Sequence, residues 1–331
     1  MTYRRTPALS VTLLICALFY ACNSDSVRSA QAQSAQSRSA QSHEDAALPR
    51  GAVSVSDMAA RAGDFGSYWY QGLAELNRYS LSQSRYGEIH EGEAVLVFVT
   101  EDFRTDRHVK FEGGSDDNVA SALKLNAYRR FYTGIYPYTI LTSTFVPART
   151  NEPAWKVTST MQEWCGTTFQ QFNATASGYD VQLRSYFDGE GDTESQVVGL
   201  LEDDLFTRAR RDPRSLPTGS ANVVPATHVL RMLHLESRAY GATLSVQEVT
   251  ETPRGAEAAL AYEIDYDSLS RTVVVYLSPA FPHQILAWTE QDGGGEGRTT
   301  TAMLTGSMLL DYWNRNRPGD AVFRDALGLS F

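Results

Sequence analysis

Alternation of apolar and polar residues dominates the chain from residue 94 onward, and a period of two predicts β-strands. The clearest case is 257–267, where Leu260, Tyr262, Ile264 and Tyr266 fall on one face and acidic residues on the other. Gly, Asn and Asp turns separate such segments, which favours an antiparallel meander. The predicted strands are 94–103, 123–132, 138–146, 155–164, 167–173, 179–187, 228–237, 243–252, 257–267, 272–277, 284–290 and 298–304.

Spacings of three and four predict helices in two places, near 65–85 and 195–211, and a short amphipathic tail at 320–327. We therefore expect a β-rich α+β fold, in which a large curved antiparallel sheet carries a few packed helices. The segments 136–141 and 281–286 share an aromatic-Pro-aromatic-polar-Ile-Leu plan. This similarity fits two related meanders, and it fits equally a common way of entering a strand with proline.

The N-terminus has the pattern of a bacterial export signal. Arg4 and Arg5 precede a short apolar segment at 9–20, and a small residue, Ala21, precedes Cys22. The apolar segment is shorter than the roughly 18 to 20 residues that span a bilayer. We expect residues 1–21 to be a lipoprotein signal peptide and Cys22 to be the lipid attachment site. Residues 22–56, rich in Ser, Ala and Gln, then form a flexible tether, and 57–331 form one globular domain.

The net charge and the cysteine content limit which molecules the protein can bind and which disulfides it can form. Arg4 and Arg5 are the only charged residues before position 22, so removing 1–21 leaves 27 basic and 39 acidic residues and a net charge of −12. Such a chain repels nucleic acid and anionic headgroups, so membrane attachment would depend on the acyl chains. Cys165 is then the only thiol left unacylated, which excludes an internal disulfide. Cys165 follows Trp164 in the sequence, and we expect it to be a buried structural residue.

No sequence motif identifies catalytic chemistry. The signatures of serine hydrolases, P-loops, zinc proteases and dinucleotide folds do not occur. His228 and His234, six residues apart on a predicted strand, would lie about 20 Å apart, so one metal ion could not bridge them. We predict no catalytic residue, no metal site and no cofactor. The carboxylates that could still pair for glycoside hydrolysis are Glu101, Asp102, Glu163 and those of 202–204.

Two further segments have plain interpretations. The acidic ridge of 263, 265 and 267 is expected to be a solvated strand face rather than a calcium site, and Gly293–Gly295 a hairpin tip. The surplus of aromatic residues between 124 and 187 is more informative, because one buried face cannot use them all. We expect Tyr136, Tyr138, Trp155 and Trp164 to line a ligand-binding concavity, which the 194–211 helix would cover.

Several motifs resemble a family of uncharacterised envelope lipoproteins from Bacteroidota and their relatives. Members carry the label "septum formation inhibitor Maf", although true Maf proteins are cytoplasmic α/β nucleotide pyrophosphatases with a Ser-rich substrate loop that is absent here. The resemblance implies that the protein is located in the cell envelope and comes from this bacterial lineage, and it implies no particular activity. The matching motifs are Tyr86–Phe103, Lys124–Asn126, Thr133–Tyr138, Gln162–Gly166, Leu216–Gly219 and Asp311–Trp313.

Together these features predict a lipoprotein anchored in the outer membrane through its N-terminal acyl chains and facing the periplasm. We expect it to be non-enzymatic and to bind an apolar lipid or a glycan component of the envelope, or to scaffold a complex. The alternative is an envelope hydrolase that uses carboxylates.

Overall fold

A computed structural model describes residues 48–292 and 298–330. Residues 46–331 form one compact unit. Cys22, the tether residues up to 47 and Gly293–Gly295 lie outside the described residues. Residues 48–56, predicted as the end of the tether, are described: Val53 pairs with Leu309, and α2 begins at Val55. The helices are α2 (Val55–Arg61), α3 (Phe65–Trp69), α4 (Glu202–Ala209), α5 (Thr227–Met232) and α6 (Ala321–Leu327), with 3-10 turns at Pro213–Ser215, Tyr312–Asn314 and Pro318–Asp320.

Sixteen strands form a single open sheet, as the alternating pattern predicted. Neighbours are antiparallel throughout, except that β10 and β11 are parallel. The order across the sheet is β10-β11-β12-β13-β14-β15-β16-β1-β2-β4-β5-β6-β7-β8-β9, with β3 beside β2. Their bounds are β1 Ala74–Arg85, β2 Glu88–Arg104, β3 Val109–Lys110, β4 Val119–Thr133, β5 Tyr136–Pro147, β6 Lys156–Glu163, β7 Gly166–Thr175, β8 Gly178–Ser185, β9 Thr193–Val197, β10 Leu200–Leu201, β11 Gly219–Val224, β12 Tyr240–Thr252, β13 Gly255–Tyr266, β14 Arg271–Leu277, β15 Ile285–Gln291 and β16 Thr299–Leu310.

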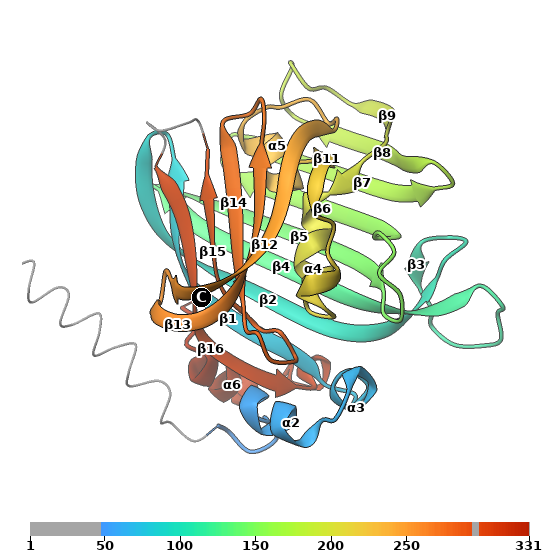
Figure 1. Ribbon diagram of the computed structural model, residues 1–331, viewed down its shortest axis with the longest axis vertical. Coiled ribbons are helices and arrows are strands. Elements are labelled where there is room, and N and C mark those ends of the chain that lie inside the picture. Colours follow the sequence, from blue (N-terminus) through green and yellow to red (C-terminus); the bar gives the residue numbers. More distant parts are fainter. Residues whose placement is uncertain (1–47, 293–297, 331) are drawn as a thin grey trace, which may run out of the picture. The chain divides into compact units, whose positions relative to one another are not determined.

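The sheet curves so that its two halves face each other, with α4 lying between them (Figure 1). Apolar side chains from both halves and from α4 form one continuous core. Phe206 of α4 packs edge-on against Trp288 of β15, with ring centroids 5.7 Å apart, while α4 also contacts β5. The curved sheet with packed helices is therefore confirmed.

The predicted helix at 65–85 is wrong for most of its length. Only α3 is helical, and β1 runs from Ala74. The buried face of β1 carries Glu75, Asn77 and Gln83 together with Tyr79 and Leu81. Since three of these five buried side chains are polar, the strand lacks the apolar alternation that would have identified it.

Two other elements differ from the prediction. The expected 228–237 strand begins instead with α5, whose six residues are all buried, so no polar face marked it as a helix. The expected 195–211 helix contains β9, β10 and a turn before α4 starts at Glu202. In the described part of the chain, no helix has the length and apolarity needed to cross a bilayer.

Candidate functional site

Charged side chains are buried between α4 and the concave face of the sheet, where an apolar core would be expected. Glu75 of β1 and Arg210, which follows α4, are both fully buried and are joined by hydrogen bonds of 2.6 and 2.8 Å. Glu75 also accepts hydrogen bonds from Tyr68 and Asn77. Burial alone would raise the pKa of Glu75, but the Arg210 charge and these hydrogen bonds hold it below its usual value.

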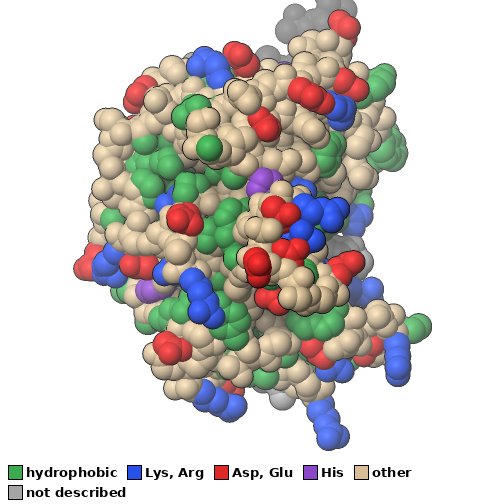
Figure 2. All heavy atoms as spheres, turned by 90° about the vertical axis from the view of Figure 1, so that its right-hand side faces the viewer, with side chains coloured by type: hydrophobic (Ala, Val, Ile, Leu, Met, Phe, Trp, Pro, Cys, Tyr) green, Lys and Arg blue, Asp and Glu red, His purple; other side chains and the backbone are tan. Residues whose placement is uncertain are grey.

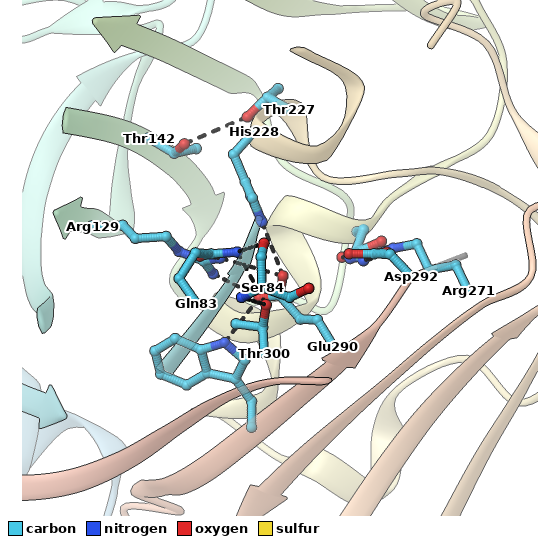
Figure 3. A network of polar contacts seen from close by, with 12 residues as sticks. Gln83, Ser84, Arg129, Thr142, Thr227, His228, Arg271, Glu290, Asp292 and Thr300 are labelled. Atoms are coloured by element: carbon cyan, nitrogen blue, oxygen red, sulfur yellow. Dashed lines mark hydrogen bonds and ion pairs between the residues drawn. The ribbon is translucent and has the colours of Figure 1, made fainter. Parts of the chain in front are cut away.

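A second buried cluster centres on Glu290 of β15 (Figure 3). Arg129 of β4 pairs with one carboxylate oxygen at 2.6 Å, and Trp288 donates to the same oxygen at 2.9 Å. His228 of α5 lies 3.2 Å from the other oxygen. Burial by itself would raise the pKa of Glu290, but the charge of Arg129, followed by His228, holds it well below its usual value. Burial, then the Arg129 charge, lowers the pKa of His228.

The first turn of α4 contributes three more carboxyl groups. Glu202 is paired with Arg271 at 2.5 Å and accepts from the Tyr266 hydroxyl at 2.7 Å. Asp204 accepts from the Ala154 amide and pairs with Arg208. Asp203 has no basic partner in the described residues, and it accepts from the Thr227 amide at 2.9 Å. Burial raises the pKa of Asp203 to about 7.

Asp203, Glu202 and Glu290 all line a cavity of about 60 Å³ between α4 and strands β2, β4, β5 and β15. Its floor is apolar, with Ala94, Leu96, Leu125 and Ile140, and its roof is α4. The volume is enough for a few water molecules, and the carboxyl groups lie on its polar side. Because arginines engage both glutamates, Asp203 is the carboxyl group that remains available for proton exchange there.

A different set of side chains meets at one end of the sheet. Strands alternate in direction, so the β1–β2, β4–β5, β6–β7 and β8–β9 connections all lie at the same end. Each carries an apolar side chain in solvent: Tyr86 is 63% exposed, Ile135 78%, Trp164 68% and Tyr186 70%. We call these four residues the hairpin-tip rim. Exposed aromatic residues gathered in this way indicate contact with another molecule.

Neighbouring rings connect the members of the rim. The Tyr86 hydroxyl lies 2.8 Å from that of Tyr138, and Tyr136 stacks beside Trp164 with centroids 6.2 Å apart. Gly166 leaves room for the Tyr186 ring, because a Cβ there would come within 2.7 Å of it. Contacts and neighbouring turn residues therefore run from Tyr86 to Tyr186 across six strands, β2, β4, β5, β6, β7 and β8.

Three of the four predicted ligand-binding aromatics thus gather at the rim: Tyr136, Tyr138 and Trp164. Tyr138 is buried and supports the rings above it. Trp155 lies at the opposite end of β5 and stacks on Phe103, with centroids 5.6 Å apart. Sequence reasoning missed Tyr86 and Tyr186, because only strand pairing brings them to the same end.

The prediction that Cys165 is buried is wrong. The residue lies in the exposed β6–β7 turn, where its backbone amide donates to Glu163 at 2.7 Å. A hydrogen bond with Glu163 and the carboxylate charge raise the pKa of the Cys165 thiol. Since the thiolate is the nucleophile, this environment lowers the reactivity of an otherwise accessible thiol.

The remaining candidates are dispersed. Glu101 of β2 pairs with Lys124, and Glu163 is the last residue of β6. His234 lies beyond α5 and contacts Glu190 at 2.9 Å, separate from the His228 cluster. No family model matches the chain, and neither the curated proteins nor the solved structures include a match. A proposal about function therefore depends on two structural features, the hairpin-tip rim and the cavity under α4.

Proposed function

We propose that the protein is a membrane-anchored envelope lipoprotein that binds a glycan through the hairpin-tip rim. The observation that carries this proposal is the set of exposed Tyr86, Trp164 and Tyr186 rings on turns at the same end of the sheet. Sugars offer flat C–H faces that stack on aromatic rings, and hydroxyls that pair with tyrosine and arginine. Tyr and Trp also provide rigid amphipathic contact area at low entropic cost.

The backbone at Tyr86 supports a binding role. Tyr86 and Gly87 form the two-residue β1–β2 turn with φ of 55° and 76°. Such turns strongly prefer Asn or Gly at the first position, and an aromatic residue in the left-handed region is uncommon. Tyrosine here costs stability and keeps its ring exposed, as expected of a residue held for a ligand.

Charge favours a glycan over a lipid surface. Arg85 is held at the rim, with its guanidinium carbon 4.2 Å from the Tyr86 ring centre and Nη1 donating to the Met232 carbonyl at 2.6 Å. The chain as a whole is acidic, with a net charge of −10. A surface of anionic lipid headgroups would therefore repel it, whereas a neutral or zwitterionic glycan would not.

Trp164→Ala is expected to weaken glycan binding about tenfold or more, since exposed aromatic anchors carry most of the energy at such surfaces. Tyr86→Asn should weaken binding too, while leaving the fold as stable or more stable. Binding is measured by sedimentation with peptidoglycan sacculi and by calorimetry with a neutral O-antigen oligosaccharide. These two ligands distinguish the glycan source.

Trp313→Ala is the matched control, because Trp313 is also exposed but follows β16 at the other end of the sheet. It should leave binding unchanged. If Trp164→Ala binds both glycans as wild type does, the proposal is wrong. Rim-dependent binding to phosphatidylethanolamine–phosphatidylglycerol vesicles without glycan binding would also overturn it, in favour of a membrane contact.

The anchor has a separate test. Cys22→Ser removes the thiol that receives the lipid, so metabolic labelling with a fatty acid should disappear, and the protein should leave the membrane fraction or remain an uncleaved precursor. Cys165→Ser is the control and should keep its label. Unchanged labelling of Cys22→Ser would exclude acylation at that residue.

A carboxylate-dependent hydrolase is supported by one observation, the Asp203 carboxyl with its pKa of about 7. Glycoside hydrolysis needs two carboxyl groups that both reach the sugar. Glu202 and Glu290 are held by arginines, and a cavity of about 60 Å³ has no room for a sugar ring. The rim therefore supports binding better than the cavity supports hydrolysis.

A further inference from the structure

A second pocket lies at the end of the sheet away from the rim. It has a volume of about 410 Å³ and is lined by Phe65, Gly66, Tyr70, Ala148, Arg149 and Arg211. Tyr136 opens β5 at the rim, whereas Ala148 follows the last residue of β5, so the strand separates the two sites. The volume falls within the range of small-molecule sites.

Two arginines reach this pocket without acidic partners. Within residues 48–292 and 298–330, neither Arg149 nor Arg211 forms an ion pair with a carboxylate. Nη1 of Arg211 is buried and has no hydrogen-bond partner. An unsatisfied buried donor is costly and uncommon, and it indicates a missing partner such as water or an anion.

On the surrounding face, acidic side chains lie among the basic ones (Figure 2), so arginines without a carboxylate partner are unusual there. Figure 2 views the side on which α3 and β3 lie in Figure 1, and there Lys and Arg side chains lie among Asp and Glu side chains. Asp64, the N-cap residue just before α3, accepts from the Ser67 amide at 2.7 Å in a capping box. The Asp64 carboxylate therefore caps α3 and does not pair with Arg149 or Arg211.

Aromatic walls complete the pocket. The Arg149 guanidinium carbon lies 5.9 Å from the centre of the Tyr70 ring, and Phe65 lies edge-on to Tyr70 with centroids 6.2 Å apart. The Tyr70 hydroxyl donates to Ser121 at 3.1 Å, which fixes the ring. Stacking on Tyr70 orients the planar Arg149 group, and guanidinium groups match the geometry of carboxylate and phosphate oxygens.

We propose that this pocket binds an oxyanion, a carboxylate or a phosphate, carried on an aromatic or apolar body. Arg149 and Arg211 bind the anion, and Phe65 and Tyr70 contact the body. Gly66 leaves space between them, since it has no side chain. The site is independent of the rim, so either can fail without the other.

The test measures binding of phenyl phosphate, benzoate, inorganic phosphate and benzyl alcohol by NMR titration of the full chain. Phenyl phosphate and benzoate should bind saturably, inorganic phosphate more weakly, and benzyl alcohol not detectably. Each of Arg149→Ala and Arg211→Gln should weaken phenyl phosphate binding about tenfold, and added salt should weaken it further. The comparison of phenyl phosphate with benzoate distinguishes the two anions.

Two further variants keep the test decisive. Gly66→Leu fills the pocket without removing a charge; a Cβ at Gly66 meets no atom closer than 3.6 Å, so the fold should tolerate it and binding should be lost. Arg214→Ala is the control, because Arg214 pairs on the surface with Glu248 and does not line the pocket. The proposal is overturned if the Arg149→Ala, Arg211→Gln double variant binds as wild type does, or if benzyl alcohol binds as well as phenyl phosphate.

Discussion

Arg210→Ala is expected to lower the free energy of unfolding by about 3 to 5 kcal/mol, because it isolates a buried charge. The substitution leaves the Glu75 carboxylate buried at 0% exposure without its counter-charge. It also removes the Arg210 hydrogen bond to the Pro282 carbonyl at 3.0 Å and its contact with the Phe98 ring. Urea unfolding followed by tryptophan fluorescence measures the change.

Two comparisons show whether the isolated charge is the cause. The double variant Glu75→Met, Arg210→Met removes both charges at similar volume, and it should recover much of the lost stability. Arg214→Ala breaks the exposed pair with Glu248 and should cost less than about 1 kcal/mol. If Arg210→Ala unfolds within about 1 kcal/mol of wild type, the pair does not hold α4 against β1.

Asp203→Asn is expected to stabilise the protein above pH 7 and to have little effect near pH 4. Burial raises the pKa of Asp203 from its ordinary 3.8 to about 7 in the folded protein. Between these values the folded chain holds a proton that the unfolded chain has released, so stability falls as pH rises through this window. The fall is at most about 4 kcal/mol, because one pKa unit corresponds to about 1.4 kcal/mol.

Asparagine cannot ionise, and its side-chain oxygen can still accept from the Thr227 amide, so the variant should lack this loss of stability. The measurement is the difference in unfolding free energy between variant and wild type at several pH values from 4 to 8. Other titrating groups cancel in that difference. Asp117→Asn, in an exposed loop, is the control and should give a flat difference. Parallel profiles for Asp203→Asn and wild type would show that Asp203 is not a buried neutral acid.

The sequence predicts the sheet where the strands bury one apolar face. In β13, Leu260, Tyr262, Ile264 and Tyr266 are all buried, as the alternation predicted. The prediction fails where the buried face carries charge, as in β1. It fails again in α5, where complete burial removes the polar face that distinguishes a helix.

The candidate sites, like the strands, could be predicted from the sequence only in part. Sequence could point to Tyr136 and Trp164, because aromatic residues exceed what one face needs. It could not place Tyr86 or Tyr186 beside them, since strand order sets those distances. The buried ionic clusters do leave a signal in the sequence, because a charged residue in the apolar phase of a strand indicates one. That signal is present in β4 and β15, where Arg129 occupies an inward position and Glu290 follows buried Trp288.

The pairing of β1 with β16 also constrains the order of folding. These strands lie side by side near the middle of the sheet, yet strands β2 to β15 separate them in the sequence, with Ala74 opposite Leu310. Hairpins from β1 to β9 need only local contacts and can form before β16 joins. β16 can join β1 only by closing a loop that contains β2 to β15, which is slow because such distant contacts lose the most loop entropy. Until then β1 presents an unpaired edge carrying Glu75, Asn77 and Gln83, and these polar side chains limit association with other chains during that interval.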